Sequence, residues 1–422
     1  MAQILPFKGI RYNTQIAGNI DKLVCPPYDI ISDEDRIYYH NIHPYNYVRL
    51  ILGEERPTDD DKYNRFIRSE EFINDWLEKG ILAYDDECFY IYEQNFEIDN
   101  TQKCVRGITA AVKIHEYDEN VILPHENTLA KPKSQLAQLI RYAKANLDSV
   151  YGLYADPEAM LSGVINNVIS SEPIVKAVDK DNVLHKLWMV CDEEQVSYIK
   201  DFFKDKQIAI ADGHHRYETA LAYRNEMREK NPNSEDMPWD YVLMTLADVY
   251  QKDLTVYPTH RVLASLADDK VNNIEALVSD LYYLKDSTKE DLVRDMALNK
   301  AIGLYKPNMA KILIPKNDYS YMLEGCDALR KLEMAQLHKL ILERVLDIGE
   351  DKLRDQTHII YTHTAQTAFD LVDSGERQMA FLLNNIDVKS VLEISASGEK
   401  MPQKATYFYP KLLSGLVCRR LV

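Results

Sequence analysis

The sequence predicts a mixed α/β (α+β) protein with more than one domain. The chain has 422 residues, whereas about 150 residues per domain are typical. Its residues are 46% hydrophobic and 28% charged, which is the balance of a globular protein. Short β-rich runs alternate with segments of helical periodicity. We expect an N-terminal α/β region over 1–115, a core over 116–265, and a C-terminal α/β region over 266–422 with a returning tail.

The N-terminal region is expected to hold helices and a β-hairpin. Ser32 precedes acidic residues and is a typical helix N-cap. The apolar run 47–55 predicts a buried strand, and 59–79 has the apolar face of an amphipathic helix. The β-rich runs 88–98 and 105–114 are separated by Asp-Asn, which predicts that they pair antiparallel.

The rest of the chain continues as alternating strands and helices. The segment 208–227 is expected to form a strand, a sharp turn and a helix. The other expected helices are 134–147, 157–168, 192–204, 329–346 and 364–374, and the other expected strands are 151–155, 173–178, 184–191, 241–248, 254–263, 358–361 and 378–383.

Charge and hydropathy argue against two classes of partner. Lys and Arg total 50 against 67 Asp and Glu, a formal charge of −17, and such a surface repels phosphate backbones. We therefore expect no nucleic-acid partner. No apolar run reaches the ~20 residues that cross a bilayer, and the first residues do not resemble a signal peptide. We therefore expect no membrane partner and a cytoplasmic location.

Cysteine and glycine spacing narrow the chemistry. The six cysteines are dispersed without a CxxC pair, so we expect free thiols rather than disulfides or a thiolate zinc site. Among the 14 glycines the closest pair is Gly9 and Gly18, so GxGxxG and the P-loop GxxxxGK[ST] are both absent. A nucleotide site here would be neither a standard Rossmann site nor a Walker site.

The most informative segment is Asp212-Gly213-His214-His215-Arg216, which joins an apolar strand directly to a helix. Free N–H groups and the dipole at a helix start favour an anion, and Gly213 lets a ligand approach the backbone. Arg216 adds a bidentate donor for phosphate. Asp212 could cap the helix, hold Mg²⁺ or orient a substrate hydroxyl. The alternative is a strand–helix junction whose histidines only pack.

The second segment is PHENT at 124–128, in a loop bounded by Pro124 and Pro132. A carboxylate beside a histidine is a candidate general base, so Glu126 and His125 are predicted catalytic residues. A His-Glu pair alone is more typical of an exposed surface. Its role therefore depends on the fold bringing it near Asp212.

Three weaker segments are candidates for binding a substrate or an anion. Tyr28 and Asp29 follow two prolines in a rigid turn. His260 and Arg261 lie at the end of a probable strand and offer a cationic pair. Lys404 belongs to a β-prone tail that could also pack as an edge strand.

The motifs do not favour a transition metal. Leu129 stands where HExxH requires its second histidine. His214 and Glu218 have i, i+4 spacing and could share a metal with His125 or His260, but such a pair on a helix is more often a local ion pair. Magnesium at Asp212 is the metal site that we predict.

Together, these segments resemble a bacterial and archaeal family described as domain of unknown function 1015 (DUF1015). The resemblance spans nearly the whole chain, although the family label implies no activity. Its carriers are PPYDIIS (26–32), PHENT (124–128), ADGHHRYETA (211–220), PTHR (258–261) and MPQKATYFYPK (401–411).

The pair PHE and DGHHR also resembles that of free serine kinases in the ParB/sulfiredoxin superfamily, which phosphorylate L-serine with ADP or ATP. This resemblance implies a ParB/sulfiredoxin-like core. It implies that Glu126 deprotonates the serine hydroxyl and that Asp212 orients that hydroxyl or Mg²⁺. His214, His215 and Arg216 would hold the transferring phosphate. The large C-terminal region has no counterpart in those kinases.

The functional hypothesis is nucleotide-dependent phosphotransfer to a small hydroxylated metabolite, most simply L-serine, with ATP or ADP and Mg²⁺ as cofactors. One alternative is a phosphatase acting on phosphoserine or a similar ester. A second is a nucleotide-switched binding protein without turnover. The expected partner is a small molecule, serine or phosphoserine, and the sequence leaves open whether the chain forms a homodimer.

Overall fold

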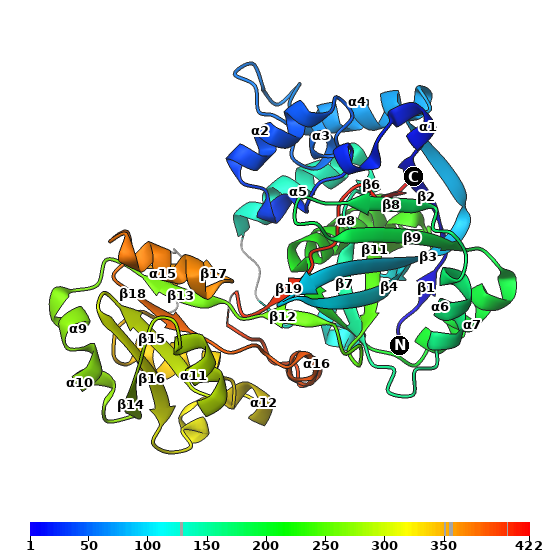
Figure 1. Ribbon diagram of the computed structural model, residues 1–422. Helices are drawn as coiled ribbons and strands as arrows, with labels where there is room; N and C mark the ends of the chain where they lie inside the picture. The colour runs from blue at the N-terminus through cyan, green and yellow to red at the C-terminus, as the bar shows by residue number, and fades with distance from the viewer. Residues whose placement is uncertain (127–129, 350–351, 354–357, 403) are drawn as a thin grey trace. The chain divides into compact units, whose positions relative to one another are not determined.

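The computed structural model describes residues 1–126, 130–349, 352–353, 358–402 and 404–422, without the side chains of 130–133. Two compact units divide the chain (Figure 1). Both combine helices with sheets, so the predicted mixed α/β class is confirmed. Unit 1 contains Met1–Pro124, Thr128–Leu254 and Pro410–Val422, and unit 2 contains His125–Asn127 and Thr255–Tyr409.

Unit 1 is built around one mixed sheet. Its described strands follow the order β5-β10-β7-β11-β4-β3-β9-β8, with β1 beside β4 and β2 beside β3. β10 is antiparallel to β7 and parallel to β5, while β11 is parallel to β7. The strands are β1 (Ile4–Leu5), β2 (Phe7–Tyr12), β3 (Leu82–Ile98), β4 (Thr101–Lys113), β5 (Ile122–Leu123), β7 (Val150–Tyr154), β8 (Val175–Val178), β9 (Leu184–Val190), β10 (Ile208–Asp212) and β11 (Tyr241–Asp248).

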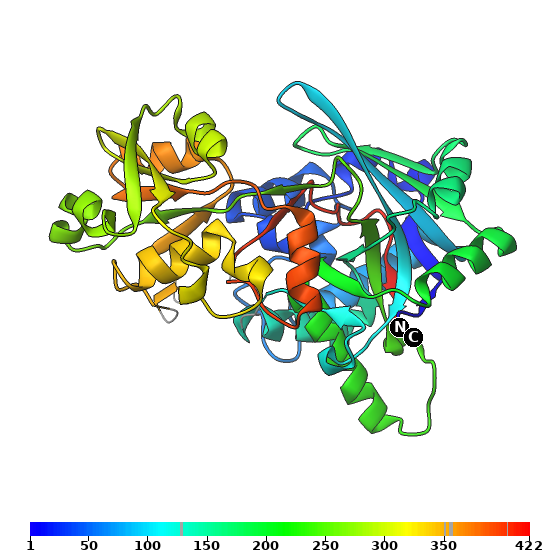
Figure 2. The ribbon, with the colours of Figure 1, turned by 90° about the horizontal axis from the view of Figure 1, so that it is seen from below.

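The predicted hairpin is confirmed and is longer than expected. β3 and β4 pair antiparallel from Tyr90 opposite Thr109 to Ile98 opposite Thr101. The connecting Asp-Asn residues have φ values of 50° and 59°, which suits a tight turn. Figure 2 shows these strands as the long cyan hairpin of unit 1.

Helices cover the sheet of unit 1 through two buried clusters. One cluster joins the strands to α7 and α8, with Ile199 and Tyr217 among its members. The other surrounds Tyr47 and Trp76, between α3, α4 and α5. The helices are α1 (Thr14–Ala17), α2 (Asp33–Ile42), α3 (Val48–Ile51), α4 (Arg65–Glu78), α5 (Ala130–Ala143), α6 (Ser162–Ile169), α7 (Glu193–Phe203) and α8 (His214–Lys230).

The strand predicted at 47–55 is wrong, since this run forms the short helix α3. The side-chain oxygen of Asn46 accepts the N–H of Val48 at 2.9 Å and thereby fixes a turn at the start of the run. Burial is as predicted, because Val48 and Leu50 are both almost fully buried. A short apolar run fits a buried helix as well as a buried strand.

The helix predicted at 59–79 begins later, at Arg65. Asn64 caps it, because its side-chain oxygen accepts first-turn N–H groups. Asp59, expected at the helix start, instead forms an ion pair with Arg68 at 2.6 Å.

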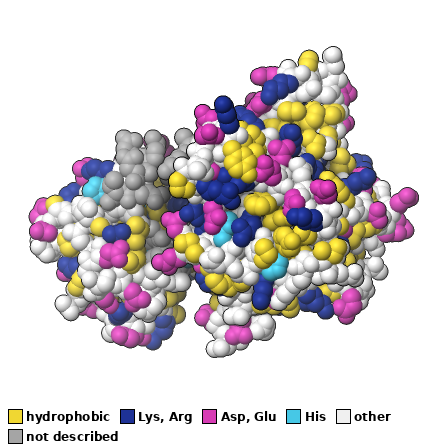
Figure 3. All heavy atoms as spheres, turned by 90° about the horizontal axis from the view of Figure 1, so that it is seen from above, with side chains coloured by type: hydrophobic (Ala, Val, Ile, Leu, Met, Phe, Trp, Pro, Cys, Tyr) yellow, Lys and Arg dark blue, Asp and Glu magenta, His cyan; other side chains and the backbone are white. Residues whose placement is uncertain are grey.

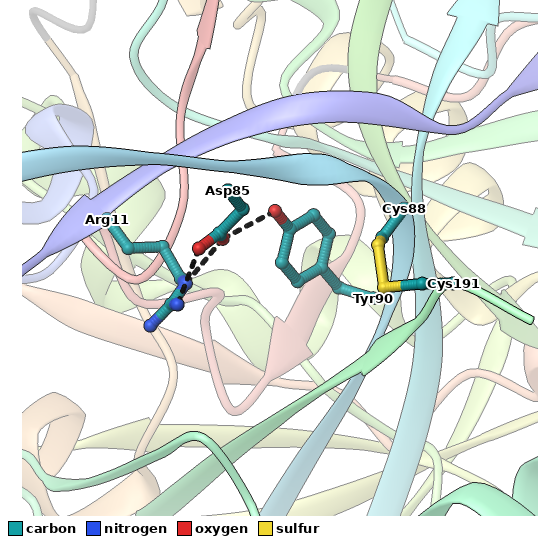
Figure 4. Close-up of a disulfide and its surroundings, with 5 residues drawn as sticks. All are labelled: Arg11, Asp85, Cys88, Tyr90 and Cys191. Carbon is teal, nitrogen blue, oxygen red and sulfur yellow. Dashed lines mark hydrogen bonds and ion pairs between the residues drawn. A yellow bond between two sulfur atoms is a disulfide. The ribbon is translucent and has the colours of Figure 1, made fainter.

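A disulfide joins Cys88 and Cys191, so the expectation of six free thiols is wrong for this pair (Figure 4). β3 and β9 lie antiparallel in a register that places the two cysteines opposite each other, with their Cα atoms 4.6 Å apart. Figure 4 shows the disulfide near the ion pair between Arg11 and Asp85, to which Tyr90 also donates a hydrogen bond. Since 103 positions separate the cysteines, local spacing gave no signal.

The disulfide has a direct chemical test. Four cysteines per chain should be alkylated when the protein is denatured with iodoacetamide without reductant, and six after reduction. Intact mass measures both numbers. Cys191→Ser should give five in both conditions, because its former partner is then free. Six alkylated cysteines in the unreduced wild type would contradict the pairing. The thiols expected to react are Cys25, Cys104, Cys326 and Cys418.

Unit 2 contains an antiparallel sheet whose described strands follow the order β14-β16-β15-β18-β13-β17. A separate pair joins β12 (Thr255–Tyr257) to β19 (Tyr407–Tyr409). The sheet strands are β13 (His260–Leu263), β14 (Tyr282–Ser287), β15 (Ile302–Lys306), β16 (Met309–Pro315), β17 (Ile359–Thr362) and β18 (Met379–Leu382). The helices are α9 (Asp268–Asn272), α10 (Ile274–Val278), α11 (Leu292–Asn299), α12 (Asp327–Arg330), α13 (Glu333–Gln336), α15 (Ala365–Asp373) and α16 (Val388–Ala396).

The single helix predicted at 329–346 is wrong. The segment forms α12, α13 and a π-helix over Leu337–Glu343. Leu332 has extended backbone angles, with φ −67° and ψ 128°, so the first helix ends before it. π-Helical turns occur frequently at functional sites.

The returning tail is divided between the units. Residues Pro410–Val422 belong to unit 1, where β20 (Arg419–Arg420) pairs with β6 (Ala145–Asn146).

The domain boundary expected at residue 115 falls between β4 and β5, which belong to one sheet. The three-domain division and the ParB/sulfiredoxin-like core stay predictions. Among the described residues, every helix is too short or too polar to span a bilayer.

Candidate functional site

The segment around Gly213 folds as predicted into strand, turn and helix. β10 ends at Asp212, Gly213 has a left-handed φ of 90°, and α8 begins at His214. A Cβ atom at Gly213 would lie 2.9 Å from Nε of Arg216, so backbone conformation and space both favour glycine. Gly213 has no side chain to cap the helix, which leaves the first-turn N–H groups to other acceptors.

Asp212 lies between two cations. Nη2 of Arg216 donates to Oδ2 of Asp212 at 2.9 Å, and Nζ of Lys411 donates to Oδ1 at 3.2 Å. Nη1 of Arg216 donates to the carbonyl of Ser149. Sequence reasoning missed Lys411 as a site residue, although it belongs to the MPQKATYFYPK motif.

The charged side chains around Asp212 stabilise one another in their ionised forms. Burial by itself would raise the pKa of Asp212, but Lys411 and Arg216 outweigh burial and hold that pKa well below its usual range. Burial opposes the charged form of Arg216, while Asp212, Asp29 and Asp148 raise its pKa. The ion pair is therefore charged at neutral pH, with its side chains already oriented.

Asp148 is a further residue that the sequence did not indicate. With Arg216 and Ser414 it lines a small cavity of unit 1. Burial raises the pKa of Asp148, and the charge of Arg216 lowers it. Its Oδ1 atom is buried and has no hydrogen-bond partner among the described residues. No local motif marks an aspartate between two short strands, so only the fold reveals it.

Tyr28 and Asp29 join the same charge cluster from a 3-10 turn at Tyr28–Ile30. Burial and then Asp29 raise the pKa of Tyr28, and Arg216 lowers it. His214 is buried in the first turn of α8, and its charge helps to lower the pKa of Asp212. We call the members of this cluster the Asp212 group: Tyr28, Asp29, Asp148, Asp212, His214, Arg216 and Lys411. His215 adjoins it and is partly buried.

A second group forms within unit 2 around Glu126. Oε1 of Glu126 accepts the backbone N–H of Lys404 at 2.6 Å. Nε2 of the fully buried His125 bonds Oγ1 of Thr406 at 3.0 Å, and its carbonyl accepts the N–H of Met401 at 2.7 Å. The tail therefore holds the His-Glu pair in place. Asn127 and Thr128 of PHENT lie outside the described residues.

Arg261 supports this group from β13. Its side chain is fully buried and donates to Nε2 of His338, at 3.1 Å, and to the carbonyl of Lys404, at 3.4 Å. Burial lowers the pKa of Arg261 to about 10, while Tyr361 and Glu126 counteract this shift. An anion at Arg261 would have to replace these acceptors, so that predicted role stays a prediction.

His260 and Lys404 were predicted to bind an anion through their cationic side chains. In the structure, His260 uses a ring nitrogen as an acceptor and Lys404 uses its backbone. Nδ1 of His260 accepts the N–H of Leu383 at 3.2 Å, and burial, followed by Arg261, lowers its pKa to about 4. His260 is thus neutral at physiological pH. Lys404 contributes backbone atoms to Glu126 and Arg261. Anion binding by its side chain stays a prediction.

The predicted residues therefore gather in two groups, one in each unit. The group within unit 2, here called the Glu126 group, consists of His125, Glu126, His260, Arg261, His338, Tyr361 and Lys404. Each group combines segments far apart in the sequence, since 278 positions separate Glu126 from Lys404 and 199 separate Asp212 from Lys411.

The described side chains form no cluster of three or more His, Cys, Asp or Glu suited to a metal ion. Asp212 has both oxygens engaged by cations, so direct Mg²⁺ binding would require one contact to open. Magnesium at Asp212 therefore stays a prediction.

Figure 3 shows Asp and Glu side chains interspersed with Lys and Arg over the face that it presents.

These features define a mixed α/β protein with a cation-bridged strand–turn–helix site. Residues 4–347 match the model of the family described as Protein of unknown function (DUF1015), so the chain belongs to that family. A search of curated proteins finds no match.

Three solved structures show a distant likeness. A free serine kinase variant in complex with AMP is 12% identical, with a TM-score of 0.37, covering 72% of this chain and 87% of that one. A conserved hypothetical protein from Pyrococcus furiosus is 13% identical, with a TM-score of 0.36 and coverages of 72% and 92%. SbnI with C-terminal truncation from Staphylococcus aureus is 11% identical, with a TM-score of 0.36 and coverages of 72% and 85%. These TM-scores are too low to assign an activity.

Proposed function

We propose that this protein transfers a phosphoryl group from ATP or ADP to the hydroxyl of a small metabolite, with L-serine as the first candidate. The observation that carries the proposal is the Gly213 turn. There the first turn of α8, which includes Arg216, lies next to Asp212, and Asp212 is paired with both Arg216 and Lys411. Helix N–H groups and fixed cations are the usual means of stabilising a transferring phosphate.

The proposed roles follow from the chemistry of the residues. Phosphate oxygens would accept from the first-turn N–H groups of α8 and from Arg216. Glu126 would take the proton of the serine hydroxyl while the serine oxygen forms a bond to the terminal phosphorus. The bond between that phosphorus and the bridging oxygen of the nucleotide breaks in the same step. Magnesium, when bound with the nucleotide, would supply charge neutralisation at the phosphates.

The orientation of Glu126 supports its role as a base. The N–H of Lys404 fixes one of its oxygens at 2.6 Å, and Arg261 braces the carbonyl of Lys404. An oriented carboxylate needs less reorganisation during proton transfer. A ParB/sulfiredoxin-like core around the turn is part of this proposal.

The test is a mass-spectrometric assay for phosphoserine from L-serine, Mg²⁺ and either ATP or ADP. Wild type should form phosphoserine only with nucleotide and Mg²⁺. Glu126→Gln should lower the rate by about 10²-fold or more, since general-base catalysis contributes about 10²–10⁴-fold. Asp212→Asn should lower it by about 10²-fold, because Asp212 holds the side chains of Arg216 and Lys411 in place. Exposed acidic residues provide matched controls: Glu229→Gln and Asp205→Asn should keep the wild-type rate.

Other results would point elsewhere. Phosphate release from phosphoserine without nucleotide, and no forward reaction, would favour the phosphatase. Nucleotide binding without turnover of any hydroxylated substrate would favour the nucleotide-switched binding protein. Full activity in Glu126→Gln would remove Glu126 from the mechanism.

A further inference from the structure

A cavity of about 180 Å³ lies within unit 2. Its lining includes Thr259 of the PTHR motif, Ala405 of the tail motif, the segment 331–334 and the segment 383–387. The proposed function uses neither this cavity nor these residues. Because drug-sized ligands occupy roughly 300–1,000 Å³, a cavity of this size suits a small metabolite.

The lining carries charges of both signs. Oε1 of Glu333 accepts from Nδ2 of Asn384 at 2.8 Å, and Oε2 accepts the N–H of Asn384 at 3.1 Å, so the carboxylate is held in one orientation. Lys331 supplies an exposed ammonium two positions away. Asp387 adds a second carboxylate, which caps α16. Two carboxylates against one lysine disfavour a phosphate and favour a ligand with an amine.

Thr259 provides an independent indication of a ligand. The residue is 1% exposed, and its Oγ1 atom has no hydrogen-bond partner among the described residues. Buried hydroxyl groups nearly always have a partner. Because Thr259 lines the cavity, a turn of its side chain about the Cα–Cβ bond would let a polar molecule bound there supply one.

We propose that this cavity binds the ammonium and carboxylate groups of a small amino acid, with Glu333 accepting from the ammonium and Lys331 pairing with the carboxylate. The choice of L-serine rests on the proposed function. The cavity also adjoins the proposed base through the chain, because Ala405 follows Lys404, whose N–H holds Glu126.

The test is calorimetric titration of the full chain with L-serine in the absence of nucleotide. Wild type should bind, and Glu333→Gln should raise the dissociation constant about tenfold or more, the usual scale for a lost charged contact. Ethanolamine has the amine of L-serine but no carboxylate, so its binding reports the ammonium contact alone. Lys331→Gln should weaken L-serine about fivefold or more and leave ethanolamine unchanged.

Exposed residues of the same unit serve as matched controls, and Glu290→Gln and Lys285→Gln should bind L-serine as wild type does. If Glu333→Gln fails to fold, the exposed Lys331 variant carries the test. Absence of L-serine binding to wild type, or unchanged affinity in the folded variants, would overturn the inference.

The site and the proposed function can fail separately. Binding that is lost in both variants, with no phosphoserine formed by wild type, would support the site and overturn the kinase. Phosphoserine formation with an unchanged KM for serine in both variants would overturn the site and leave the kinase standing.

Discussion

Arg216→Met is expected to lower the free energy of unfolding by about 3–5 kcal/mol, the usual cost of removing one partner from a buried ion pair. The side chain of Arg216 is only 8% exposed and contacts Asp212 at 2.9 Å. Asp29 and Asp148 also stabilise its charge. Without the guanidinium, these carboxylates would repel one another in a poorly solvated environment.

Urea unfolding measures this loss. Arg294→Met is the matched control, because Arg294 is exposed and its ion pairs are solvated; its effect should stay within about 0.5 kcal/mol. Adding Asp148→Asn to Arg216→Met should recover part of the stability, because it removes a buried carboxyl group that has lost the stabilising charge of Arg216. A loss below about 1 kcal/mol in Arg216→Met would contradict the electrostatic role.

The second large effect is acid destabilisation of unit 2 through His260. Its pKa is about 4 in the folded chain, against about 6.5 in an unfolded one. Between these values the unfolded state binds the additional proton, so stability is complete above pH ~6.5 and falls as the pH drops toward 4. The difference of about 2.5 pKa units corresponds to about 3 kcal/mol. His338, with a pKa well below its usual value, acts in the same direction.

Chemical unfolding at pH 7.5 and at pH 4.5 measures how the free energy of unfolding depends on pH. Hydrogen exchange of unit 2 peptides, used to monitor the unfolding, assigns the effect to that unit. His260→Asn keeps a hydrogen-bond acceptor for Leu383 and should reduce the loss of stability between the two pH values by about 2 kcal/mol. An identical pH dependence in His260→Asn and wild type would contradict the assignment.

Local patterns predicted the elements on which the candidate site rests. The turn at Gly213 and the hairpin at 88–114 formed as expected, since each depends on neighbouring residues. The run 47–55 was misassigned because a four-residue buried helix and a buried strand have the same apolar composition. The broken helix at 329–346 depends on the backbone of Leu332, which periodicity does not report.

Residue patterns were sufficient to predict the mixed α/β class and the local geometry of the Asp212 turn, because hydrophobic periodicity and glycine conformation act over a few residues. The long-range partners of these residues emerged from the folded chain alone. Lys411 reaches Asp212 across 199 positions, and Cys88 meets Cys191 across 103. It also decided that Glu126 is held by the tail within unit 2. Such contacts depend on how strands register and how distant segments pack, and no short window of sequence contains that information.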